Sequence, residues 1–216
     1  MQRDRYFSMW RSVGGLVILF MIILSGCGGV AQQQSGTTNT GSSSSELQGT
    51  DLGETPAPGF QLVDQYGHSI TLSQFKGMPV ILTFFYTHCP DYCPLMAQKI
   101  HSSLVQLGSQ AQKVAIVAIS ADPEGDTPAS VATFSQTHQL QGYANWHYLL
   151  GTRQALTPIW ASYHVSGVPP HAKMMSASAM QHSALIYVID QQGQERVLLD
   201  SDFQPSQLTK DIQILL

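Results

Sequence analysis

Two cysteines, Cys89 and Cys93, stand four residues apart directly after the apolar run at 80–85. A strand that ends in a cysteine-bearing loop is typical of a working thiol site. The residues from Leu95 to Leu107 carry apolar side chains at helical spacing, which predicts that the pair lies at the start of a helix. There the helix dipole favours thiolate and lowers a thiol pKa that is ordinarily near ~8.5.

Thiolate is the form of cysteine that binds a soft metal ion or attacks a disulfide. Three residues separate Cys89 from Cys93, whereas dithiol oxidoreductases usually have two, and the wider spacing lets both sulfurs point at one ion. Two such ligands favour Cu(I), Zn(II) or iron–sulfur chemistry over Mg(II) or Ca(II). A structural disulfide is the plain alternative, but a link that closes so short a loop removes little entropy from the unfolded chain.

The elements that must position these thiols follow from the apolar patterns. The expected order is a hairpin at 60–72, a strand at 80–85, a helix at 95–107, a strand at 114–119, a helix at 128–138, a strand at 146–150, a helix at 152–163, a hairpin at 184–199 and a helix at 205–216. This order predicts an α/β fold, a thioredoxin-like sandwich with an extra N-terminal β-hairpin. The site would lie at the carboxyl end of the first core strand.

The dithiol needs a third ligand if it holds a metal, and His182 is the candidate. It immediately precedes the apolar strand at 183–188, and in a thioredoxin-like fold the loop entering that strand faces the cysteines at the helix start. A lone histidine is more often a surface or core residue than a metal ligand, so the prediction for His182 depends on its expected position in the fold. In the segment at 122–128, the Asp-Pro and Asp-Thr-Pro runs predict a turn in which Asp126 or Thr127 caps the helix that Pro128 opens.

Residues 1–27 have the pattern of an export signal, with a basic start, an apolar core at 13–24 and the ending Leu24-Ser25-Gly26-Cys27. That ending resembles the lipobox of bacterial lipoproteins, which implies cleavage before Cys27 and a lipid anchor in the cell membrane. An uncleaved anchor is the alternative, and both place the rest of the chain outside the cytoplasm. Residues 28–51 are rich in Ser, Gln, Thr and Gly and are expected to form a flexible tether, so that 52–216 is the folded domain.

The net charge and the number of cysteines further limit the functions that the chain can have. Residues 1–27 carry three Arg and one Asp, so the rest of the chain has 7 basic and 13 acidic residues, a net charge of −6. This charge argues against binding of nucleic acid, which requires a basic surface. Lipidation of Cys27 would leave Cys89 and Cys93 to pair only with each other.

Three separated segments together resemble one known family. They are Phe84 to Pro94 around the cysteines, Ile119 to Pro128 with its Asp-Pro and Asp-Thr-Pro runs, and His182-Ser183-Ala184. They resemble the Sco/SenC family of copper-binding, thioredoxin-like proteins associated with cytochrome c oxidase assembly. The resemblance implies that Cys89, Cys93 and His182 bind copper, as Cu(I), Cu(II) or both, and that Asp122 supports the site.

The chain departs from the family pattern next to His182. Members commonly carry an acidic residue just before this histidine, whereas Met180-Gln181 stands here. The preceding segment at 168–180 also contains Met174, Met175 and His171. Methionine sulfur is a soft ligand suited to Cu(I), but filling of gaps around a loop is the plainer role for these side chains. His171 and His88 are weaker ligand candidates.

Two functions remain open from the sequence. The first is a lipid-anchored copper chaperone that delivers copper to the dinuclear copper site of cytochrome c oxidase, with the copper-site subunit and extracytoplasmic copper-donor or thiol-disulfide proteins as partners. The second is a thiol-disulfide reductase in which Cys89 attacks a disulfide of the acceptor and Cys93 resolves the intermediate. A peroxidase on this fold would need Thr or Ser and Pro where Tyr86 and Leu82 stand, which argues against that activity.

Overall fold

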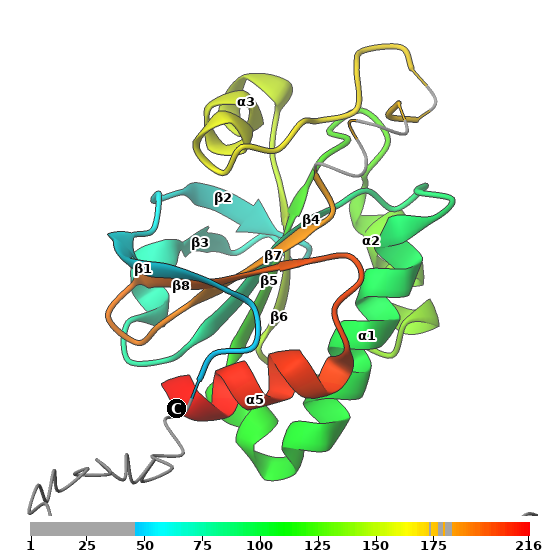
Figure 1. Ribbon diagram of the computed structural model, residues 1–216. Helices are drawn as coiled ribbons and strands as arrows, with labels where there is room; N and C mark the ends of the chain where they lie inside the picture. The colour runs from blue at the N-terminus through cyan, green and yellow to red at the C-terminus, as the bar shows by residue number, and fades with distance from the viewer. Residues whose placement is uncertain (1–45, 173, 177–178, 180–182) are drawn as a thin grey trace, which may run out of the picture. The chain divides into compact units, whose positions relative to one another are not determined.

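The computed structural model describes residues 46–172, 174–176, 179 and 183–216. In this part of the chain, eight strands form one sheet in the order β1-β8-β7-β4-β5-β6-β2-β3 (Figure 1). The strands are β1 Thr50–Pro56, β2 Gln61–Asp64, β3 Ser69–Thr71, β4 Val80–Phe85, β5 Ala115–Ser120, β6 Trp146–Leu150, β7 Leu185–Ile189 and β8 Gln194–Asp200. The helices are α1 Tyr92–Leu107, α2 Pro128–Thr137, α3 Arg153–Ser162 and α5 Pro205–Leu215, with the short 3-10 helices η1 Leu72–Phe75 and η2 Gly108–Lys113.

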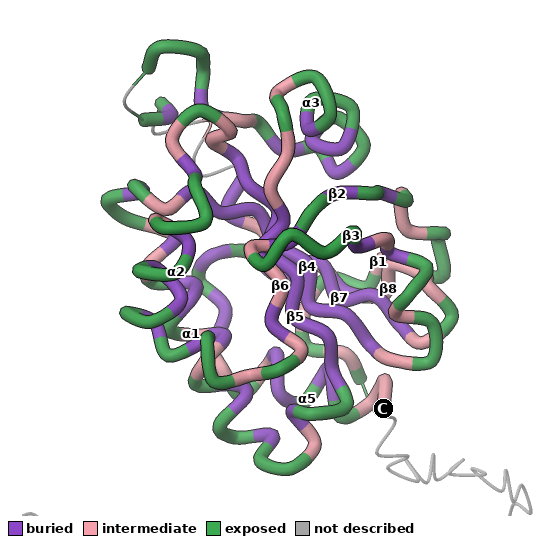
Figure 2. The backbone as a smooth tube through the Cα atoms, turned by 180° about the vertical axis from the view of Figure 1, so that it is seen from behind, coloured by how far each residue is buried: buried purple, intermediate pink, exposed green. Residues whose placement is uncertain are grey.

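Strand β4 lies in the middle of the sheet, parallel to β5 and antiparallel to β7. Every residue of β4 and β5 is buried, as the purple centre of Figure 2 shows. Strands covered on both faces have no need for polar alternation, which explains their continuous apolar runs. Helix α1 connects these two parallel strands, so the predicted βαβ unit is confirmed.

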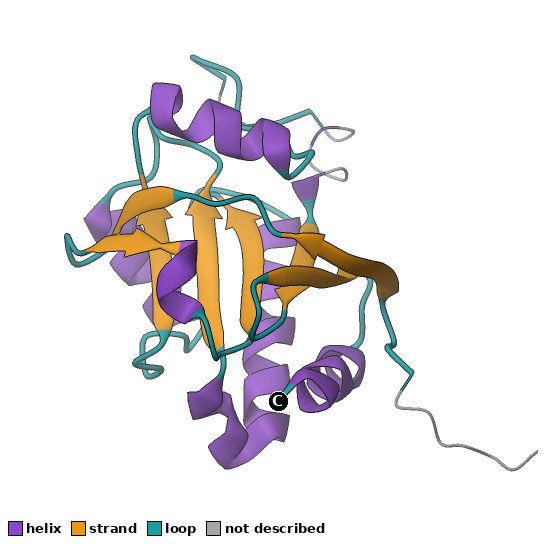
Figure 3. Ribbon diagram, turned by 90° about the vertical axis from the view of Figure 1, so that its left-hand side faces the viewer, coloured by secondary structure: helices purple, strands orange, loops and turns teal. Residues whose placement is uncertain are grey.

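The two faces of the sheet bury two separate clusters of side chains. On one face, Ile81 and Phe85 of β4 pack with residues of α1, α2 and α5, and on the other face Leu82 packs with residues of α3 and η1. Alternate residues of one strand point to opposite faces, so a single apolar strand supplies both clusters. Figures 1 and 3 show α3 apart from α1 and α5, with the sheet between them. The predicted thioredoxin-like sandwich is confirmed.

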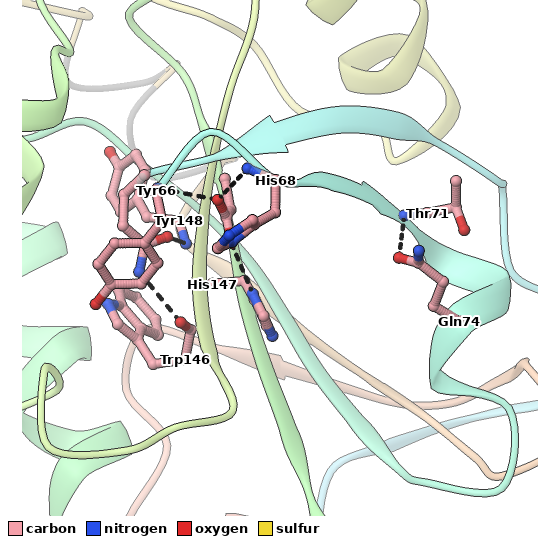
Figure 4. Close-up of polar contacts among 9 residues, drawn as sticks. Tyr66, His68, Thr71, Gln74, Trp146, His147 and Tyr148 are labelled. Atoms are coloured by element: carbon pink, nitrogen blue, oxygen red, sulfur yellow. Dashed lines mark hydrogen bonds and ion pairs between the residues drawn. The ribbon is translucent and has the colours of Figure 1, made fainter.

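The predicted N-terminal hairpin is present and joined to the sheet. Strands β2 and β3 pair antiparallel, and β2 also pairs with β6. The buried Asp64 carboxylate accepts hydrogen bonds from the N–H groups of Tyr66 (2.9 Å) and His68 (2.8 Å), and its Oδ2 lies 3.3 Å from Nδ1 of His68 and 3.4 Å from Nδ1 of His147 in β6 (Figure 4). Burial opposes ionisation of Asp64, but these hydrogen bonds outweigh it and lower the pKa.

Strand β1 has no counterpart among the expected elements. It pairs antiparallel with β8 and begins at Thr50, two residues before the predicted start of the folded domain. Just before it, Gly49 packs so closely that a Cβ atom there would lie 2.4 Å from Cγ1 of Val197. The Asp211 carboxylate accepts hydrogen bonds from the N–H groups of Gln48 (2.5 Å) and Gly49 (3.1 Å), which ties this end of the chain to α5.

The predicted signal at 1–27, with Cys27, lies outside the described residues. Among the residues that are described, no helix combines the length and the apolar character that crossing a membrane requires.

Candidate metal and redox site

Strand β4 ends at Phe85, and a six-residue loop leads from it to the start of α1 at Tyr92. Cys89 lies in this loop and Cys93 is the second residue of the helix, as the spacing predicts. The two cysteines are not joined by a disulfide in the structure, and each is 6% exposed. The pair therefore sits at the carboxyl end of the central strand, just beneath the surface.

The sulfur of Cys89 occupies the positive end of α1. It accepts a hydrogen bond from the backbone N–H of Cys93 at 3.4 Å, while the side chain of Asp91, at the N-cap position, makes no cap hydrogen bond. The first N–H groups of a helix have no partner inside the helix, so a negative sulfur is stabilised at this position. The Cys89 side chain thus acts as the N-terminal cap of α1.

The two thiols differ in acidity. The pKa of Cys89 is lowered to about 6, first by its hydrogen bond with the Cys93 thiol and, against the cost of burial, by N–H groups of the helix start. The pKa of Cys93 is raised well above its ordinary value, mainly by burial and then by the neighbouring Cys89. Near neutral pH the pair therefore holds one thiolate, on Cys89, and one proton, on Cys93.

Tyr86, the residue after β4, adds a third polar group to the cysteine pair. Its side chain is buried, and burial together with the adjacent Cys89 and Cys93 raises the pKa of its hydroxyl above the ordinary range. The hydroxyl faces the Cys89 sulfur, yet it meets no hydrogen-bond partner of normal geometry among the described residues. A buried hydroxyl in this state costs free energy unless a ligand or partner satisfies it.

Asp126 lies beneath the cysteine loop, and its role differs from the one the sequence suggested. Its Oδ1 accepts hydrogen bonds from the N–H (2.7 Å) and the hydroxyl (2.8 Å) of Thr87, while its Oδ2 accepts from the hydroxyls of Ser120 (2.6 Å) and Tyr148 (2.8 Å). Burial raises the pKa of this carboxyl. Of the two predicted caps of α2, Thr127 is confirmed, whereas Asp126 does not cap the helix and is instead a buried anchor between the cysteine loop, β5 and β6.

Asp126 was missed as a site residue because an Asp before Thr-Pro has the local signature of a turn, and the three residues that donate its four hydrogen bonds lie in three other segments. The one sequence signal was position, since Asp126 falls in the loop after the second core strand, on the edge of the sheet that also carries Cys89.

Asp122 forms the turn that precedes Asp126. Its carboxylate accepts a hydrogen bond from the N–H of Gly125 at 3.1 Å, and its own N–H donates to the Ser120 hydroxyl at 3.2 Å. A Cβ on Gly125 would lie 2.1 Å from Oδ2 of Asp122, so glycine is the residue that lets this carboxylate close the turn. Support of the dithiol by Asp122 stays a prediction.

A narrow cavity of about 10 Å³ opens beside Cys93, with room for about one water-sized sphere. Its walls come from β4, α1, the loop after β5 and the segment that enters β7: Phe84, Tyr86, Tyr92, Cys93, Met96, Ala121, Met175, Ser183 and Ala184. The expectation that the segment entering the late strand faces the cysteines is therefore confirmed for Ser183 and Ala184. His182 and Met180 lie outside the described residues.

The described part of the chain contains no group of three His, Cys, Asp or Glu side chains placed to hold a metal ion. Cys89 and Cys93 supply two soft ligands of suitable chemistry. His88 and His171 are both exposed, and His88 approaches the hydroxyl of Thr87 (3.2 Å) rather than a thiol.

Solved structures match this chain over most of its length. Bradyrhizobium japonicum ScoI with copper bound is 30% identical with a TM-score of 0.62, over 75% of this chain and all of that one. Yeast Sco1 with copper bound is 25% identical with a TM-score of 0.62, over 74% of this chain and 87% of that one. BsSco, described as a member of the Sco family of cytochrome c oxidase assembly proteins with a disulfide switch, is 22% identical with a TM-score of 0.62, over 77% and 96%.

Among curated proteins, the mitochondrial protein SCO2 homolog of Bos taurus is 30% identical over 138 residues, which is 62% of this chain and 50% of that protein. A SCO2-like protein of Rickettsia conorii is 26% identical over 62% of this chain and 64% of its own length. The chain thus spans about half to two thirds of these relatives. The family model described as SCO1/SenC matches residues 49–216, which include β1, the dithiol and the Asp126 turn. This chain belongs to the SCO1/SenC family.

Proposed function

We propose that this protein is a lipid-anchored, extracytoplasmic copper chaperone that delivers copper to the dinuclear copper site of cytochrome c oxidase. The observation that carries the proposal is the pair of free cysteines at the start of α1, where the Cys89 sulfur accepts a hydrogen bond from the N–H of Cys93 and the pKa of Cys89 is lowered. The chain belongs to the SCO1/SenC family, and a Sco family member of similar structure is described as a cytochrome c oxidase assembly protein, which supports the choice of acceptor. Two related structures contain copper, which supports the choice of metal.

Copper is the cargo in this proposal, and Cys89, Cys93 and His182 are its ligands. Cu(I) prefers sulfur and imidazole donors, and Cys93 gives up its proton to solvent when the ion binds. Thiolates of the acceptor then replace these ligands one at a time. The export signal and Cys27 would hold the protein at the outer face of the bacterial cell membrane, where the copper-site subunit is accessible.

Copper affinity of the purified full-length chain tests this function. Reduced protein is titrated against competing Cu(I) and Cu(II) chelators, for the wild type, Cys89→Ser and His182→Ala. We expect one copper per chain in the wild type, loss of binding in Cys89→Ser and weaker binding in His182→Ala with an unchanged melting temperature. A wild-type protein that retains no copper would refute the chaperone function.

The difference in acidity between the thiols favours a second function, reduction of a disulfide in the copper acceptor. The Cys89 thiolate would attack one sulfur of the acceptor disulfide, forming a mixed disulfide and releasing one acceptor thiolate. Cys93, after losing its proton, would attack the Cys89 sulfur, which forms the Cys89–Cys93 disulfide and releases the second acceptor thiolate. An extracytoplasmic dithiol protein must then reduce the pair again.

The Cys93→Ser variant tests the reductase function separately. The variant is mixed with a peptide that carries the oxidised acceptor disulfide, and mass spectrometry detects a stable adduct on Cys89. The wild type should release reduced peptide without a lasting adduct. If the wild type leaves the peptide oxidised and the variant forms no adduct, reductase chemistry is excluded while copper binding is unaffected.

A further inference from the structure

Met175 is buried at the dithiol although most of the segment that carries it is exposed. Its side chain is 3% exposed, whereas the neighbouring Met174 is 50% exposed and His171, Ala172 and Ser176 are also exposed. One long apolar side chain of this segment therefore turns inward while the others face solvent. The position into which it turns is the cavity beside Cys93.

Sulfur-bearing side chains reach this cavity from two segments of the chain. Cys93 and Met96 line it from successive turns of α1, on one face of the helix, and Met175 lines it from the opposite chain segment. Cys89 belongs to the same cluster of buried side chains. The Tyr86 hydroxyl lies next to both the Met175 backbone and the Cys89 sulfur, which places Met175 close to the thiolate as well as to Cys93.

Simple gap filling explains the burial of Met175 but not the buried hydroxyl that lines the same cavity. Tyr86 is 1% exposed, and no described residue satisfies its buried hydroxyl with normal geometry, which is costly in an apolar pocket. A wall with a thiol, two thioethers and a buried hydroxyl suits a soft cation better than it suits an apolar occupant.

We propose that the thioether of Met175 is a ligand for Cu(I), completing a three-sulfur site with Cys89 and Cys93. This inference rests on the proposed copper function and adds a donor to it. A thioether is neutral and soft, so it stabilises Cu(I) and contributes little to Cu(II). Because Met175 comes from the segment that leads toward His182, the protein has a sulfur donor available for Cu(I) when the imidazole is not bound.

The experiment compares Met175→Leu with Met174→Leu in the full-length chain. Leucine keeps the apolar volume and removes the sulfur, and Met174 is the matched control because it is adjacent and exposed. Chelator competition should show that Met175→Leu weakens Cu(I) binding about tenfold, which is about 1.4 kcal/mol, with less than about a twofold change for Cu(II). Met174→Leu should behave as the wild type. X-ray absorption at the copper edge should show three sulfur neighbours in the wild type and two in Met175→Leu.

A second measurement does not depend on the folding of any variant. In wild-type protein labelled with selenomethionine and loaded with Cu(I), absorption at the selenium edge should show a copper neighbour at bonding distance. Absence of that neighbour, or unchanged Cu(I) affinity and sulfur number in Met175→Leu, overturns the role of Met175 while the chaperone function stands. A wild type that holds no copper overturns the proposed function itself.

Discussion

Replacement of Asp126 by Ala tests whether the cysteine loop depends on the carboxylate beneath it. The change removes four hydrogen bonds, to Thr87 (two), Ser120 and Tyr148. Ser120 and Tyr148 are fully buried, so their hydroxyls are left without this partner or water. At about 1–3 kcal/mol for each stranded buried donor, and with a cavity in place of the carboxyl group, we expect a loss of about 3–5 kcal/mol in the free energy of unfolding.

The Asp126→Asn variant separates charge from shape. Its side-chain oxygen still accepts from Thr87, and its NH₂ group can donate to hydroxyl oxygens that rotate to accept, so we expect a loss of only about 1–2 kcal/mol. Burial raises the pKa of Asp126, so the folded state binds its proton more tightly than the unfolded chain does. The charged carboxylate therefore costs stability as pH rises above 3.8, and the wild type should lose part of its advantage over the variant between low pH and pH 7.

Equilibrium unfolding in urea at pH 7 measures these differences, and alkylation of Cys89 by iodoacetamide reports on the loop. Asp211→Ala is the matched control, because Asp211 is fully buried and accepts two backbone N–H groups far from the thiols. Both Ala variants should be destabilised, but Asp126→Ala alone should change the alkylation rate. A loss below about 1 kcal/mol for Asp126→Ala, or an unchanged rate, would refute its role as the anchor.

Three further changes are expected to have defined effects. Cys93→Ala removes the main cause of the low Cys89 pKa, so this pKa should rise from about 6 toward that of an ordinary thiol, measured by the pH dependence of alkylation; a midpoint that stays near 6 would contradict this. Asp64→Asn should lower stability at pH 7 and flatten its pH dependence, because the lowered pKa of Asp64 stabilises the wild type above pH 3.8 and this contribution is lost as pH falls through the folded-state pKa. Urea unfolding of wild type and variant at pH 7 and pH 3 measures their free energies of unfolding, and the same change with pH in both proteins would exclude the effect. Gly167→Ala should lower the free energy of unfolding by about 1–3 kcal/mol, because the new Cβ would lie 2.4 Å from the ring of Trp160. The indole cannot easily move away, since its N–H donates a hydrogen bond to β5. An unchanged melting temperature would count against this packing.

The fold was predictable because each core element carries its own local signal. Runs such as Val80 to Phe85 have no polar alternation, and only strands covered on both faces tolerate that pattern. Strand β1 has no such signal. Six of its seven residues are exposed and its sequence is polar, so its strand conformation depends on pairing with β8 and not on local propensity.

The sequence alone determined which residues could do chemistry. The spacing of Cys89 and Cys93 after a buried strand indicated a thiol site at the start of a helix, because strand and helix periodicities are local properties of the chain. It could not show how far the two thiols differ in pKa, since that depends on the hydrogen bond between them, on the burial of Cys93 and on the N–H groups at the start of α1.

Only the tertiary structure decided the surroundings of the pair. Asp126 meets Thr87 from 39 residues away and Tyr148 from 22, and Met175 reaches a cavity whose far wall lies in α1. Contacts between segments so distant in the chain are set by how β4, β5 and β6 align, because parallel strands bring their carboxyl ends to one edge. The sequence therefore determined the donor types, and the alignment of the sheet decided which of them meet.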